Sequence, residues 1–168
     1  LGQRQESNQY LKRLKQGNSE DRSLYQQSIF LRHLVVYYYE QDELGGPMDD
    51  AIREFLSFGV TPKNSYFHNR AFFIHQAKIR FAQYHTAPAE QAESKRNQWI
   101  QAIRDLEVLG RYSVIARCNA MIMQAALKRT KGSYQEALHE LDDAELMAKE
   151  QNNPIAIFDA AYHRALTW

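Results

Sequence analysis

Six histidines are the residues most able to bind a metal ion or to carry a proton near neutral pH. His68 and His75 are seven residues apart in a segment with helical spacing, which puts them on one face but about 10.5 Å apart along the axis. That separation is too long for two ligands of one metal ion. The chain also lacks the His-Glu-x-x-His pattern of zinc hydrolases. We therefore interpret these two histidines as surface or core-edge residues, and we expect no metal and no other cofactor.

Paired carboxylates or an activated nucleophile would indicate an enzyme. Acidic pairs occur three times, at Asp42-Glu43, Asp49-Asp50 and Asp142-Asp143. Adjacent side chains diverge around a helix, so this spacing does not pair a general acid with a general base. The sequence contains no Gly-x-Ser-x-Gly motif and no phosphate-binding Gly-rich loop. We expect a protein that is not an enzyme.

The single cysteine, Cys118, lies in a mostly apolar helical segment, which predicts a buried and unreactive thiol. One cysteine cannot form an intramolecular disulfide or a zinc site of several thiolates. This cysteine usage is typical of a reducing compartment, and we expect a cytoplasmic location.

Charge and hydropathy argue against two classes of partner. The 21 Lys and Arg against 20 Asp and Glu leave a net charge of +1, which creates no strong field toward nucleic acid. The basic clusters are short and carry no interleaved aromatic residues for base stacking, at Lys12–Lys15, Lys95-Arg96 and Lys128–Lys131. The longest apolar run, Leu34–Tyr39, is far shorter than the roughly 20 residues that span a bilayer. The sequence therefore favours neither nucleic acid nor a membrane.

The elements that position these residues are helices. Apolar residues recur at three- and four-residue steps, and no stretch alternates with period two, so the fold class is all-α. We predict seven main helices, near 20–43, 48–58, 64–84, 88–109, 112–131, 133–150 and 154–168, and a polar helical segment at 3–16. Pro154 after Asn153 indicates a helix start, and Ser133 with Glu136 predicts a capping box. Short connectors predict stacked antiparallel helical hairpins.

Internal repetition is the most informative pattern in this sequence. Three segments share the order polar, Ala, aliphatic, basic or His, acidic, and then a large apolar residue, at Asp50–Gly59, Gln101–Gly110 and Glu136–Glu145. Their alanines, Ala51, Ala102 and Ala137, are 51 and 35 positions apart. The second spacing is close to the tetratricopeptide period of about 34 residues. A lengthened hairpin around residues 86–95 could absorb the extra residues of the first spacing.

The third segment resembles a tetratricopeptide repeat of the longer-helix kind seen in bacterial regulators and sensors. Ala125 stands at the small position of the first helix, Gly132 at the turn, and Tyr134, Ala137 and Ala144 at second-helix positions. The resemblance implies an α-solenoid with units near 20–59, 64–110 and 112–151 and a further unit starting at 154–168. Residues 1–168 would form one domain. Because the chain starts at Leu1 without Met and stops within a helical pattern at Trp168, we interpret it as a fragment of a longer protein.

The resemblance also implies a concave face that binds a protein or peptide segment. In the first and third units the alignment places these residues on that face: His33, Val36, Glu40, Asn119, Ile122, Ala126 and Arg129. The middle helix is apolar almost all round, so its polar residues could reach a bound chain: Asn69, Gln76 and Arg80. An Asn side chain suits this task because its amide both donates to and accepts from an extended backbone.

Three functions follow, from different classes. The first is a non-catalytic module that binds a protein or peptide within a larger regulatory or signalling protein. The second is a structural homodimerisation domain that uses apolar residues at the C-terminal end: Ala160, Tyr162, Leu166 and Trp168. The third is a helical domain that binds nucleic acid, which the charge pattern does not favour.

Overall fold

The fold is all-α, as the helical spacing predicts. The computed structural model describes residues 23–168, and the predicted helical segment 3–16 lies outside that range. The described part forms seven helices without a strand: α2 (Leu24–Glu40), α3 (Gly46–Ser57), α4 (Phe67–Thr86), α5 (Ala89–Gly110), α6 (Val114–Thr130), α7 (Tyr134–Glu150) and α8 (Pro154–Ala165). No helix between residues 23 and 168 has both the length and the apolar content to cross a bilayer.

Local signals explain where the helices begin. Ser23 and Gln26 form a reciprocal capping box at the start of α2. Asn153 accepts a hydrogen bond from the backbone N–H of Ala156, and Pro154 occupies the first helical position of α8. The predicted capping box at Ser133 is wrong, because its side chain makes no capping hydrogen bond. Its ψ of 59° departs from the extended backbone that turns a capping side chain toward the helix.

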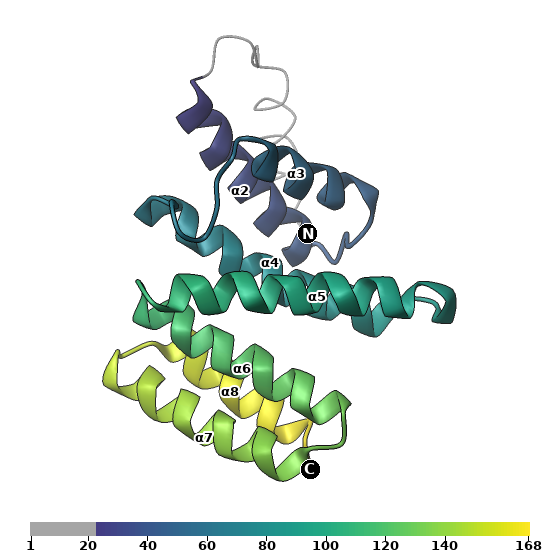
Figure 1. Ribbon diagram of the computed structural model, residues 1–168, viewed down its shortest axis with the longest axis vertical. Coiled ribbons are helices and arrows are strands. Elements are labelled where there is room, and N and C mark those ends of the chain that lie inside the picture. Colours follow the sequence, from purple (N-terminus) through teal and green to yellow (C-terminus); the bar gives the residue numbers. More distant parts are fainter. Residues whose placement is uncertain (1–22) are drawn as a thin grey trace, which may run out of the picture.

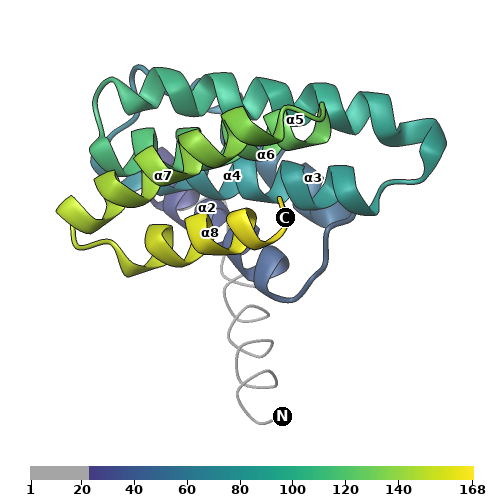
Figure 2. The ribbon, with the colours of Figure 1, turned by 90° about the horizontal axis from the view of Figure 1, so that it is seen from below.

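The helices form two layers of stacked antiparallel hairpins (Figure 1). Helix α2 pairs with α3, α4 with α5, and α6 with α7, while α8 packs on α7 and on α6. We call α2, α4, α6 and α8 the inner layer, because each packs on the next in that order. Helices α3, α5 and α7 form the outer layer. Figure 2 looks along the axis on which the hairpins stack, and it shows α5 on one side of the molecule and α8 on the other.

Small residues lie where the helices meet, as the repeated pattern predicts. Ala51, Ala102 and Ala137 are all buried. Gly110 ends α5 so close to α6 that an added Cβ would stand 3.0 Å from the Cα of Arg117. The space between the layers is filled by large buried side chains: Phe55, Phe72, Phe73, Trp99, Leu106 and Leu141. Burial of these side chains supplies the main driving force for stacking the hairpins.

Candidate functional site

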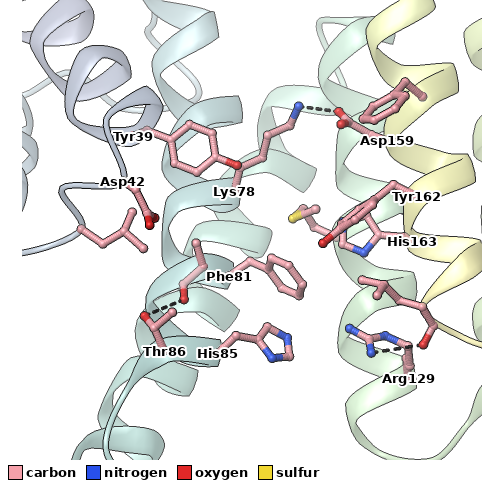
Figure 3. Close-up of a pocket in the computed structure, with 15 residues that line it drawn as sticks. Tyr39, Asp42, Lys78, Phe81, His85, Thr86, Arg129, Asp159, Tyr162 and His163 are labelled. Carbon is pink, nitrogen blue, oxygen red and sulfur yellow. Dashed lines mark hydrogen bonds and ion pairs between the residues drawn. The ribbon is translucent and has the colours of Figure 1, made fainter. Parts of the chain in front are cut away.

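A pocket of about 570 Å³ opens on the inner layer. Its walls come from the end of α2 and the loop after it, from α4, from α6 and from α8. In Figure 3 the α4 side chains Phe81 and His85 face Tyr162, His163 and Arg129 on the opposite wall. We call this the inner pocket. Its volume lies within the range usual for small-molecule and side-chain binding sites.

The inner pocket exists because the inner layer bends. Lys78 of α4 forms a 2.5 Å ion pair with Asp159 of α8, although α6 packs between these two helices in the layer. Both side chains are mostly buried. This ion pair crosses one end of the pocket (Figure 3). It closes the pocket there and holds α4 and α8 at a fixed separation.

Two helices supply aromatic and apolar walls. On α4, the lining residues Lys78, Phe81 and His85 follow helical steps of three and four residues. On α8 and at its C-cap, Phe158, Tyr162 and Leu166 are four residues apart and are 69%, 50% and 42% exposed. Large apolar side chains with this much exposure in a concave surface are typical of binding sites.

Tyr39 of α2 contributes a phenol group to the inner pocket. Burial raises the pKa of Tyr39, and the negative charge of Asp159 raises it further. The phenol therefore stays protonated at neutral pH, and its hydroxyl group can both donate and accept a hydrogen bond.

His163 is the most buried polar residue of the inner pocket, at 5% exposure. Its ring lies 5.0 Å from that of Phe81, and its Nδ1 atom is buried without a hydrogen-bond partner. Burial lowers the pKa of His163 to about 4, and the positive charge of Arg129 acts in the same direction. The imidazole is therefore neutral at pH 7, with one nitrogen that donates and one that accepts.

Arg129 brings a cation to the same end of the pocket. It lies in the last turn of α6, and its Nη1 atom donates one long hydrogen bond of 3.4 Å to the carbonyl oxygen of Leu166. Its Nε atom is buried without a partner, and no carboxylate of residues 23–168 forms an ion pair with it. Burial and the charge of Arg129 also lower the pKa of the neighbouring His85.

Of the ten residues that the sequence predicts for a concave binding face, Arg129 lines the inner pocket. The other three on α6 are buried, and the Asn119 amide donates to the carbonyl oxygen of Ile115 within its own helix. On α2, Val36 is half-buried while His33 and Glu40 are exposed. None of these six residues lines the pocket.

The three predicted residues of α4 lie on nearly the opposite side of that helix from the pocket wall, given 100° of rotation per residue. Asn69 and Gln76 are buried in the packing between helices. Arg80 binds Asp49 of α3 and the side chain of Gln83. None of the three lines the inner pocket, and the side-chain oxygens of Asn69 and Gln76 are buried without a hydrogen-bond partner among the described residues.

The pocket residues that were not predicted do follow a recognisable pattern in the sequence. On α4 the series Lys78, Phe81 and His85 combines charge and aromatic character at helical spacing, and α8 repeats large apolar residues every four positions. Because α4 is apolar on nearly every face, its sequence does not show which face a neighbouring helix covers. The packing of α6 and α8 decides which face stays open.

Cys118 is buried as predicted, and its Sγ atom donates to the carbonyl oxygen of Ala144 at 3.2 Å. Burial raises the pKa of this thiol to about 11, so almost none of it is the reactive thiolate at neutral pH.

Within residues 23–168, no three His, Cys, Asp or Glu side chains gather as a metal site. The lining of the inner pocket offers hydrogen bonds, apolar contact and one cation, Arg129, that has no carboxylate partner within that range.

Comparison with known proteins gives no match. No protein-family model, curated protein or solved structure matched this chain.

Proposed function

We propose that the protein is a non-catalytic module that binds a segment of another protein, or a peptide, in the inner pocket. The observation that carries this proposal is the combination of exposed aromatic walls with two buried nitrogen atoms that have no hydrogen-bond partner in the described chain, Nε of Arg129 and Nδ1 of His163. Phe158 and Tyr162 offer apolar contact, while Arg129 and the Nδ1 atom of His163 offer hydrogen bonds. Interfaces concentrate their binding energy in such aromatic and arginine side chains.

We also propose that the hairpins belong to a tetratricopeptide-like array. The buried alanines at 51, 102 and 137 and the bent inner layer support this proposal. Ala125 and Ala144 are buried as well, whereas Tyr134, which the resemblance places at a second-helix position, is 53% exposed. Stacked hairpins bury their apolar faces against neighbours and leave a curved surface, which such arrays use for recognition.

Selection from a random peptide library tests the proposed function. The immobilised chain is expected to enrich peptides that bind it, and Tyr162→Ala should weaken those peptides about tenfold or more, since it removes an aromatic wall of the pocket. Tyr134→Ala is the matched control, because Tyr134 has similar exposure but lies outside the pocket. The proposal fails if no peptide is enriched, or if both variants bind the selected peptides as the unchanged chain does.

Self-association through α8 is a second candidate, favoured by the exposure of its apolar face. Ile155 of α8 is 68% exposed, and Trp168, which follows the end of the helix, is 88% exposed. Ala160, however, is fully buried, so the sequence-based prediction that it belongs to this exposed surface is wrong. It packs inward because α7 and α6 cover that side of α8.

A further inference from the structure

We propose that the inner pocket binds a carboxylate group of its peptide at the end formed by Arg129, His163 and His85. This inference rests on the proposed function, because it assigns the chemical class of the group that the pocket holds there. The carboxylate site is at one end of the pocket, and the aromatic walls could bind a peptide that makes no contact there.

The guanidinium group of Arg129 is the first feature that favours a bound carboxylate. Its Nη1 atom has one long hydrogen bond, its Nε atom is buried without any, and no carboxylate of the described chain pairs with it. A partly buried charge without a counterion is unfavourable, and a bound anion would relieve that. The planar donor fork of arginine matches the two oxygens of a carboxylate.

His163 is a second, independent feature that favours a bound ligand at this end of the pocket. It lines the pocket, is 95% removed from solvent, and keeps its Nδ1 atom without a partner. Buried polar atoms are nearly always hydrogen-bonded in folded proteins, so this atom is suited to a group that arrives with the ligand. Figure 3 shows His163 and Arg129 on the same wall, with His85 opposite.

The charges of the pocket favour one carboxylate over a doubly charged phosphate. Lys78 is neutralised by Asp159, and Asp42 adds a negative charge at the end of α2. Arg129 is therefore the one cation in the pocket lining without a carboxylate partner. A single guanidinium matches a single negative charge, and Asp42 and Asp159 would repel a second one.

The aromatic walls indicate that the ligand carries a large apolar side chain as well as a carboxylate. Phe81 contacts the ring of His163, and Tyr162 lies next to His163 in α8. A large apolar side chain can pack on these rings when the carboxylate meets Arg129. The ligand class is a peptide that carries an aromatic residue next to a carboxylate, either at its C-terminus or on an Asp or Glu side chain.

Three small probes test the inference on the full chain. They are N-acetyl-phenylalanine, its uncharged C-terminal amide, and that amide with a glutamate added. Binding is followed by NMR of the histidine rings. We expect the acid to bind about tenfold more tightly than the amide, because a charge-assisted pair with Arg129 forms only with the acid. If the glutamate probe binds as tightly as the acid, the pocket accepts a carboxylate from a side chain as well as from the C-terminus. If it binds only as tightly as the amide, the pocket requires the C-terminal carboxylate.

A pH titration provides a second readout. Arg129 lowers the pKa of both His163 and His85, and the other charged groups that act on His163 are Asp159, Lys78 and His85. A carboxylate on Arg129 offsets its charge, so the acid should raise both histidine pKa values and the amide should not. A purely structural Arg129 would leave both values unchanged when the acid is added.

Variants identify the residue responsible. Arg129→Gln should remove the tenfold preference, while Arg117→Gln, an exposed arginine on the same helix, should keep it. If Arg129→Gln does not fold, Arg129→Lys keeps the charge without the donor fork and should reduce the preference severalfold. Equal binding of acid and amide, or a preference that survives Arg129→Gln, overturns the inference. In either case library-selected peptides can still depend on Tyr162, so this failure is distinct from failure of the proposed function.

Discussion

At the scale of single residues, Asp49 shows how one carboxylate links three helices. It lies in the first turn of α3, accepts from Arg80 and Gln83 of α4, and forms a 3.3 Å ion pair with Lys95 of α5. Burial alone would raise the pKa of Asp49, but the Gln83 hydrogen bond and the charges of Arg80 and Lys95 together lower it. The first hairpin is thereby tied to the second.

We predict that Asp49→Asn lowers the free energy of unfolding by about 1–3 kcal/mol at pH 7, since it leaves Arg80 without its counterion. A lowered pKa stabilises the fold above the ordinary aspartate value, and that contribution is lost as pH falls through the lowered pKa. The difference between variant and unchanged chain should therefore shrink below about pH 4. Urea titrations at several pH values measure it.

The neighbouring Asp50 is the control for this prediction. Its side chain is 70% exposed and pairs with the equally exposed Arg53 one turn away. Exposed pairs of this kind contribute little to stability, so Asp50→Asn should have a small effect at every pH. Equal destabilisation by the two variants would show that Asp49 has no special role.

At the scale of elements, the approach of α5 to α6 depends on a missing side chain. The Cβ of an alanine at position 110 would stand 3.0 Å from the Cα and 3.3 Å from the N of Arg117. The backbone of α6 cannot give way as a flexible side chain can. We predict that Gly110→Ala lowers the free energy of unfolding by about 1–3 kcal/mol, as overpacking does elsewhere. Thermal or urea denaturation measures the change.

Gly46→Ala is the matched control for Gly110→Ala. Gly46 also lies at a helix end, but an added Cβ there meets no atom within 4 Å. Alanine should be neutral or slightly stabilising at that position, because it reduces the freedom of the unfolded chain. A Gly110→Ala variant as stable as Gly46→Ala would show that the two helices can separate without cost.

Helix positions could be predicted from sequence better than the open face of each helix. Capping residues and helical spacing act within a few residues, so the starts at Ser23 and Asn153 depend on local sequence. The inner pocket depends on the bend that brings Lys78 to Asp159, 81 residues away. Nothing local to α4 shows that Gln76 packs inward while Phe81 lines a pocket, because both faces of that helix carry large apolar residues.

At the scale of the whole molecule, the inner pocket and self-association through α8 compete for the same side chains. Phe158 and Tyr162 line the pocket, and a dimer formed on the exposed face of α8 would cover them. If the pocket is a free recognition surface, we expect the mass of a single chain over a wide range of concentration. Sedimentation equilibrium measures this. A mass that rises with concentration, and that Ile155→Lys restores to one chain, would favour the dimer instead.

Mapping a library-selected peptide onto the chain by backbone NMR tests most directly whether the inner pocket is the binding site. If it is, chemical-shift changes should be concentrated on the inner layer, around Phe81 and His85 of α4, Arg129 of α6, and Tyr162 and His163 of α8. Changes concentrated on α3, α5 and α7, with the pocket residues unaffected, would contradict it.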